Sequence, residues 1–329
     1  MEVINSTPYA MERVVIFDKQ GNETLLVVIK ATYDFFQEGT QLAAVQVPIV
    51  HADEYLGDEL TTSMRVASDL LPKRPTTGVT LFGEAVSSKG PVRSMQVGVR
   101  IGDLTCSALV MGDRLGFGQV NNPQPFETMP LIWENSYGGF DNSENDLAKH
   151  DALQDNPIGR GFMASSSKLS PDEIYLPNIE HPETPLEAPR KGGKAVGFCP
   201  IPPAWLARRQ YAGTYDDHWQ MERMPLLPED FDERFLQCAP AALTANHYLS
   251  GQEPVTLLGM TEEGRLNFHL ATKPPVVGVR LHKAGTLSHP NLESIHIDVT
   301  ARQVYCTWKS EINIQGQAES FRSVEARIL

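Results

Sequence analysis

The sequence predicts a mainly β (α+β) protein, with a sandwich or barrel-like sheet body, a long loop-rich middle insertion and a few short helices. Apolar and polar residues alternate over 1–120 and again over 251–329, as they do in half-buried strands. The middle zone, 121–250, is crowded with Pro, Gly, Asn and Trp and shows no clear period. Because 329 residues can bury a substantial core, we expect one domain over 1–329, built from these three zones.

Four hairpins are predicted in the two β zones. Apolar runs flank a Gly-Asn pair at 21–22 and a Gly-Asp pair at 102–103, and both pairs suit tight turns. Similar runs turn at 263–264 and near 301–302. Prolines punctuate 68–78, so this connection should form neither helix nor strand.

Three short helices are expected in the insertion, over 144–153, 203–210 and 229–239. The last follows Pro228 and begins with two acidic residues, which suit the positive end of a helix dipole.

The composition excludes some classes of binding partner and indicates the cellular compartment. A formal net charge of −13 gives no basic footprint for nucleic acid or for an anionic membrane. No apolar run approaches the roughly 20 residues of a membrane helix, and the first residues lack a secretory signal pattern. We therefore expect a soluble cytoplasmic protein. Four widely spaced cysteines form no CxxC and are expected to be reduced, small apolar residues: Cys106, Cys199, Cys238 and Cys306.

The motifs of common enzymes and metal sites are absent. The chain has no GxSxG, HExxH, P-loop or GxGxxG followed by a helix. The run 141–152 departs from a calcium loop at its sixth and twelfth positions, Asp146 and Ala152. We predict no metal, no cofactor and no enzymatic activity.

One strand could be taken for part of a catalytic triad. His296 and Asp298 share a strand face, and Ser288 and His289 lie nearby in the sequence. No nucleophile turn or oxyanion-hole glycine pair accompanies them, so a solvated strand face is the preferred interpretation.

The enzyme alternative that stays open is a hydrolase that uses His218. Asp216 or Asp217 would act together with this histidine, although no nucleophile is evident beside it.

Glycine-rich turns at 137–141 and 156–162 give a further hint. Arg160, between two glycines, could clamp an anion with neighbouring backbone N–H groups. A structural arginine paired with an acid of the loop is the favoured alternative.

The stretch 208–240 mixes aromatic rings with arginines, which is the composition of interface hot spots. Core packing is the favoured alternative for its rings, and ion pairs with Asp216, Glu222, Asp230 or Asp232 are the default for its arginines. With Trp205, just before this stretch, and two residues of the glycine turns, the candidate partner-binding residues are Tyr137, Arg160, Trp205, Arg209, Tyr211, Tyr215, Trp219, Arg223, Phe231 and Arg234.

Eight segments, in order, carry a family resemblance over nearly the whole chain. They are VVIKATYDF (27–35), HADEYLGD (51–58), SDLLPKRPTTGVTLFGEA (68–85), MGDR (111–114), WENSYGGFD (133–141), NPIGRGF (156–162), PNIE (177–180) and AGTYDDHWQMERMPLLPEDFDERFLQCAP (212–240). Together they resemble a bacterial type VI secretion accessory family, long listed as a domain of unknown function and encoded beside the VgrG spike and effectors with a PAAR tip domain. The last segment is the most specific.

The resemblance implies a cytosolic, non-enzymatic adaptor or chaperone. Such a protein would bind a PAAR-domain effector at its N-terminal region, stabilise it and help to load it onto the VgrG spike. A structural component that travels with the secreted spike is a third alternative.

Overall fold

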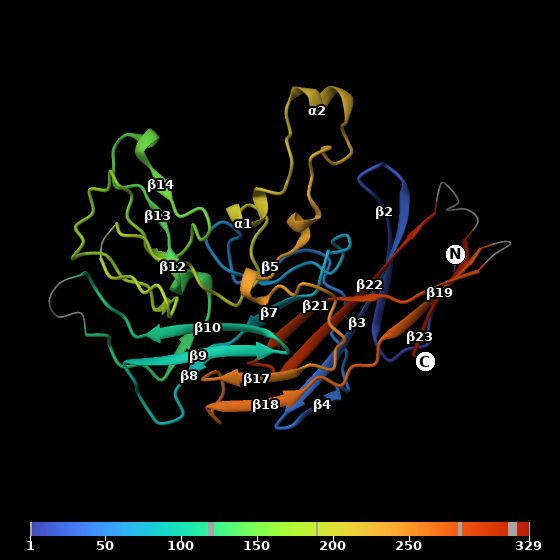
Figure 1. Cartoon of the computed structure of the whole chain (residues 1–329), viewed down its shortest axis with the longest axis horizontal. Coiled ribbons are helices and arrows are strands. Elements are labelled where there is room, and N and C mark those ends of the chain that lie inside the picture. The colour runs from blue at the N-terminus through green and yellow to red at the C-terminus, as the bar shows by residue number, and fades with distance from the viewer. Residues whose placement is uncertain (1, 118–121, 189, 282–284, 315–320, 329) are drawn as a thin grey trace.

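The computed structural model describes residues 2–117, 122–188, 190–281, 285–314 and 321–328. Over these residues the chain is mainly β, with 40% strand and 7% helix, and none of its sheets closes into a barrel. The mainly β prediction is therefore confirmed, and the barrel-like form is wrong. Figure 1 shows the sheets gathered in one body, with the loop-rich insertion and the segment that carries helix α2 extending from it.

The largest sheet contains β3, a long strand whose ten residues from Thr24 to Tyr33 are all buried. The hairpins predicted at 21–22 and 301–302 are confirmed, because β2 pairs with β3 and β21 with β22, both antiparallel. The strands in spatial order are β2 (Ala10–Phe17), β3 (Glu23–Phe36), β22 (Gln303–Asn313), β21 (Asn291–Asp298) and β7 (Gly78–Phe82), with β4 (Gly39–Leu42) also paired to β3.

A second sheet is formed by strands of both β zones and one strand of the insertion. The hairpins predicted at 102–103 and 263–264 are confirmed, and Gly102 has a φ of 55°, which explains the glycine there. Its strands in spatial order are β16 (Ile179–Glu180), β10 (Leu104–Met111), β9 (Ser94–Ile101), β17 (Pro254–Leu258) and β18 (Arg265–His269).

A third sheet joins the two ends of the described chain and contributes to the same core. Phe35 and Phe268 stack at 4.8 Å between the first two sheets, and Tyr9 stacks on Trp308 at 6.0 Å. All four belong to the largest buried apolar cluster, which includes residues of all three sheets. The third sheet consists of β1 (Glu2–Asn5), β23 (Phe321–Ile328), β19 (Pro275–Leu281) and β20 (Gly285–Ser288).

The proline-punctuated connection covers the other face of the largest sheet. As predicted, 68–77 forms neither helix nor strand, but Gly78, the last residue of the predicted connection, begins β7. The connection brings Asp69 to 2.8 Å from Lys30 of β3, with both side chains buried. A buried carboxylate needs hydrogen-bond donors, and Asp69 also accepts hydrogen bonds from Val50 N–H and from the Thr307 hydroxyl.

The solvated-face interpretation of β21 is wrong, because His296 and Asp298 are buried. His296 Nδ1 lies 2.8 Å from Thr80 Oγ1, and its ring stacks on Tyr305. Burial lowers the pKa of His296 to about 4. Asp298 pairs with Arg65 at 3.1 Å. Strand alternation placed the two residues on one face correctly but could not show that a distant segment covers that face.

The helix predictions succeeded once. Helix α1 (Leu206–Arg209) lies within 203–210. The other two predictions fail as α-helices. The range 144–153 contains the 3-10 turn η2 (Leu147–Lys149) and strand β14 (Asp151–Ala152), and 229–239 contains the 3-10 turn η3 (Glu233–Leu236). Helix α2 (Asp217–Glu222) was missed. The remaining short elements are β5 (Glu54–Tyr55), β6 (Met64–Val66), β8 (Glu84–Val86), β11 (Thr128–Pro130), β12 (Tyr137–Gly138), β13 (Phe140–Asp141), β15 (Arg160–Gly161), η1 (Trp133–Asn135) and η4 (Ala241–Leu243).

Across the described ranges, the structure holds no helix with the length and apolar character needed to cross a bilayer.

Candidate functional site

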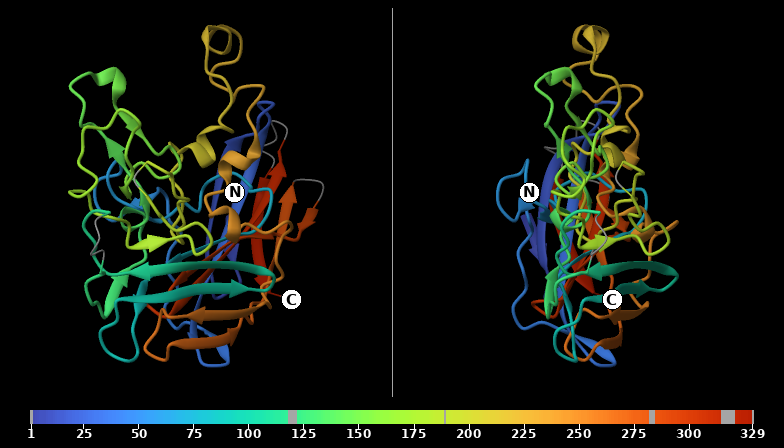
Figure 2. Two further views of the ribbon diagram at one scale, coloured as in Figure 1. Left: turned by 60° about the vertical axis from the view of Figure 1, so that its left-hand side comes forward. Right: turned by 90° about the vertical axis from the view of Figure 1, so that its left-hand side faces the viewer.

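The stretch that the sequence singled out forms a projecting arm, defined here as residues 211–232. The arm leaves the body after α1, carries α2 at its tip and returns at η3. Figure 2 shows it extending from the body in both views, beside the loops of the insertion. Its position makes it the most prominent candidate for contact with another protein.

A buried arginine holds the base of the arm. Arg208, 2% exposed, donates from Nε to Phe235 O and from Nη1 to Ile201 O, both at 2.8 Å. Its guanidinium lies over the Phe235 ring, and burial lowers its pKa. The sequence does not distinguish this residue from its neighbour Arg209. Only helix α1 separates them, because it buries Arg208 and leaves Arg209 exposed.

Side-chain hydrogen bonds join the two limbs of the arm to each other and to the sheet body. Asp230 accepts from Thr214 N–H at 2.9 Å and from its hydroxyl at 2.7 Å, and these bonds lower the pKa of Asp230. Arg223 donates to Leu227 O at 2.9 Å and to Lys19 O in the turn between β2 and β3. The arm is thus held by polar contacts rather than by a sheet ladder.

The tip exposes apolar side chains around a capped helix. Asp216 accepts from Trp219 N–H at 2.9 Å, and the Tyr215 ring packs edge-on against Trp219 at 4.7 Å. Tyr215, Met221 and Met224 are 53%, 75% and 60% exposed. Exposed methionine and tyrosine are typical of surfaces that bind other proteins.

Three of the predicted partner-binding residues lie in the interior. Tyr137, Trp205 and Phe231 are at most 7% exposed, and Trp205 packs edge-on against Trp133 at 5.4 Å. Their side chains cannot reach a partner in this conformation, so the partner-binding prediction is withdrawn for these three. The other aromatic candidates, Tyr211, Tyr215 and Trp219, are half-buried or exposed.

The predicted arginines differ in their partners. Arg234 forms an ion pair with Asp232 at 2.6 Å and lies over the Tyr211 ring. The ion-pair default fails for Arg209, which donates to Gln154 Oε1 at 2.9 Å. It also fails for Arg223, whose bonds reach backbone carbonyls.

Arg160 is a structural residue rather than an anion clamp. Its Nε donates to Glu134 O at 3.1 Å, Nη1 to Asn178 Oδ1 at 2.9 Å and Nη2 to Asn135 Oδ1 at 2.8 Å. Every guanidinium nitrogen therefore has a neutral partner. The nearest carboxylate, on Asp113, is 3.8 Å away and comes from outside the loop.

The hydrolase alternative centres on a hollow of about 260 Å³ at the arm tip. His218 and Asp216 both line it, but Asp216 is already engaged as the cap of α2. Thr214 lines the hollow as well, with its hydroxyl bonded to Asp230. No charge relay is assembled by these contacts.

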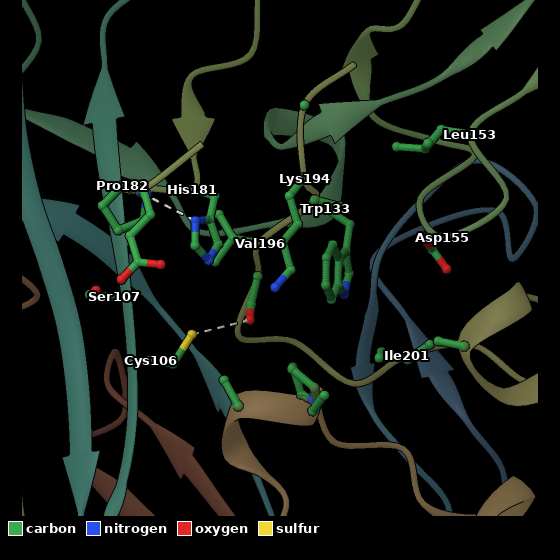
Figure 3. A pocket seen from close by; sticks show the side chains of 18 of the residues that line it. Cys106, Ser107, Trp133, Leu153, Asp155, His181, Pro182, Lys194, Val196 and Ile201 are labelled. Carbon is green, nitrogen blue, oxygen red and sulfur yellow. Dashed lines mark hydrogen bonds between the residues drawn. The ribbon is translucent and has the colours of Figure 1, made fainter. Parts of the chain in front are cut away.

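A cavity of about 540 Å³ lies where the insertion meets the second sheet. Figure 3 shows Cys106 and Ser107 of β10 on one side, with Lys194, Val196 and Trp133 across from them. Burial raises the pKa of the Cys106 thiol to about 12, which makes it a poor nucleophile. This cavity could not be predicted from the sequence, because its walls come from distant segments.

The described residues bring together no group of three or more His, Cys, Asp or Glu side chains that could hold a metal ion. All four cysteines are buried and form no disulfide, as expected for small apolar residues.

A family model covers the residues that form the arm and the cavity. No curated protein and no solved structure matches the chain. One family model matches residues 20–309, a span from the β2–β3 turn into β22. Since that span covers most of the sequence, the chain belongs to DUF2169, a family described as an uncharacterized protein conserved in bacteria.

Proposed function

We propose that this protein is a non-enzymatic, cytoplasmic adaptor of type VI secretion, which binds a PAAR-domain effector and helps to load it onto the VgrG spike. The observation that carries the proposal is the apolar tip of the arm, where Tyr215, Met221 and Met224 face solvent. The resemblance of 212–240 to the accessory family supports the assignment to secretion.

The chemistry of the tip suits the capture of a client protein. An apolar side chain more than half exposed gains free energy when a partner covers it, and methionine adapts its shape to different surfaces. Asp217 and Glu222 flank these side chains in α2 and are exposed. Carboxylates around an apolar centre favour a client with basic residues around an apolar segment.

The base of the arm suits the same task. Arg208 and the Asp230–Thr214 pair fix the arm before a partner arrives, so less conformational entropy is lost on binding. A fixed tip of modest area gives reversible capture, which a loading factor needs in order to release its effector to the spike.

Co-purification from the native bacterium tests the proposal. The tagged protein should retain a PAAR-domain effector or the VgrG spike, and deleting its gene should reduce effector secretion. A Met221→Ser/Met224→Ser variant should lose the effector. A Val45→Ser/Leu287→Ser variant should keep it, because it removes two exposed apolar side chains away from the arm.

Two results would count against the adaptor. Recovery of neither protein, together with normal secretion after deletion, would reject it. Secretion of the protein itself into the culture medium would favour a structural component of the spike.

A further inference from the structure

Strand β10 has a partner along one edge and only a short partner along the other. On one side it pairs with β9 from Leu104 to Met111. On the other side β16 pairs with Leu109 and Val110 only. The second edge is thus unpaired over the first half of β10, and this half lines the cavity of about 540 Å³.

The hydrogen bonds at the end of β10 show which backbone groups face the unpaired edge. Met111 N–H donates to Asn178 O on the β16 side at 2.7 Å, whereas Gly112 N–H donates to Arg93 O on the β9 side. Backbone groups of successive strand residues point to opposite edges. Thr105 and Ser107 share the parity of Met111, so their N–H and C=O groups point toward the cavity. Among the described residues, these groups have no hydrogen-bond partner.

A proline ends the pairing. The β10–β16 register places Leu109 opposite Glu180, so the next hydrogen-bonded pair would be Ser107 with Pro182. Proline has no N–H and cannot donate to Ser107 O. The chain instead turns away, with Thr184 N–H donating to His181 O at 3.1 Å.

The cavity beside this edge has walls of mixed character, because Asp155, His181, Glu183 and Lys194 line it as well as apolar residues. Val196, Ile201 and Ala207 line it together with the Trp133 ring. Thr105 is exposed and Ser107 is half-buried, and Ala241 and Ala242 of η4 also line the cavity. At about 3.3 Å per residue, the unpaired part from Leu104 to Ala108 offers about 16 Å of edge.

We propose that the unpaired edge of β10 binds an extended segment of a partner protein as an added strand. The segment continues the line of β16, exchanges backbone hydrogen bonds with Thr105 and Ser107, and places small apolar side chains at alternate positions into the cavity. This site goes beyond the proposed adaptor function, because it is separate from the arm and requires only that the partner offer such a segment.

A peptide panel provides the test. The probes are fluorescent, end-blocked hexapeptides with Val, Ile or Ala at even positions and Ser or Thr at odd positions. Binding to the full chain is followed by fluorescence anisotropy. We expect at least one peptide to bind. N-methylation of its backbone on the residues that face β10 should weaken binding about tenfold or more, and N-methylation of the alternate residues should not.

Variants of one residue test the same edge from the protein side. Ser107→Pro removes an N–H that no described residue uses and should weaken binding about tenfold, whereas Ser107→Ala keeps the N–H and should bind like wild type. If Ser107→Pro fails to fold, the N-methylated peptides decide the question without altering the protein.

Amide hydrogen exchange of the folded protein locates the contact. Bound peptide should slow exchange at Thr105 and Ser107, while Cys106 and Ala108, which face β9, are slow in both states. Absence of binding by every peptide, or binding unaffected by N-methylation on either face, would overturn the proposal. Loss of effector from the Met221→Ser/Met224→Ser variant with peptide binding intact would separate this site from the adaptor function.

Discussion

Replacing Arg208 with methionine tests whether its hydrogen bonds hold the base of the arm. Methionine retains an unbranched apolar stem that can pack on Phe235, so the cavity left behind is small. The substitution removes the donors to Phe235 O and Ile201 O, which lie in a buried region. The expected effect is therefore the loss of two hydrogen bonds from a charged group.

The magnitude follows from the number of bonds. A hydrogen bond to a charged group contributes about 1.5–3 kcal/mol, so the loss of two should cost about 3 kcal/mol at the lower end. This range is measured from folded proteins and already includes the cost of removing the cation from water. If the loss acts on local opening of the arm, about 3 kcal/mol raises the open population on the order of 100-fold.

Amide hydrogen exchange read by mass spectrometry measures that population. Peptides covering 211–232 should exchange on the order of 100-fold faster in Arg208→Met than in wild type. The matched control is Arg209→Met, at the neighbouring position, where the exposed side chain donates only to Gln154 Oε1 and the change should stay within about 0.5 kcal/mol.

A result in the opposite direction would refute the reasoning. If Arg208→Met exchanged as slowly as wild type or more slowly, the cost of burying a cation without a carboxylate partner would outweigh its two hydrogen bonds. The arm would then be held by its other contacts, which include the Asp230–Thr214 and Arg223 hydrogen bonds.

Three further outcomes follow from buried or capping groups. Because the pKa of His296 is lowered to about 4, the unfolded chain binds more protons than the folded one below pH 6.5, so stability is full above pH 6.5 and should fall by roughly 3 kcal/mol toward pH 4. Urea midpoints across this range should show the loss, and His296→Asn should reduce it. Lys30→Met leaves the Asp69 carboxylate buried without its partner and should cost about 3–5 kcal/mol in thermal unfolding, whereas Lys191→Met, at an exposed pair, should change stability by less than about 1 kcal/mol. Asp216→Ala removes the cap of α2 and should cost about 1 kcal/mol, seen as faster amide exchange in α2 alone.

The sheet body could be predicted because its signals are local. Each hairpin is signalled within about 20 residues, by apolar and polar residues that alternate on both sides of a turn dipeptide. All four hairpins formed where these signals predicted them. What local alternation could not show is which face a distant segment covers. His296 and Asp298 alternate correctly, yet both are buried, His296 beside Thr80 and Asp298 beside Arg65.

The failed helices show how side chains were assigned to the wrong partners. Asp230 was expected to favour a helix over 229–239, but its carboxylate binds Thr214 across the arm. Asp216 was expected to pair with an arginine or with His218, but it caps α2. In both cases the acid follows the usual rules of hydrogen bonding, and the choice among partners depends on tertiary contacts that a sequence window does not contain.

Where the insertion and the arm meet the body, arginine side chains donate hydrogen bonds to backbone carbonyls that have no strand partner. Loops without ladders leave carbonyl groups without donors, and buried carbonyls need one. Arg114 donates to Pro177 O, Arg160 to Glu134 O, Arg208 to Phe235 O and Ile201 O, and Arg223 to Leu227 O and Lys19 O. An arginine reaches two loops at once because its donors point in different directions. The arginines of the insertion and arm that resembled interface anchors in the sequence therefore serve the fold in part, and the surface that we propose for a partner is the apolar tip of the arm.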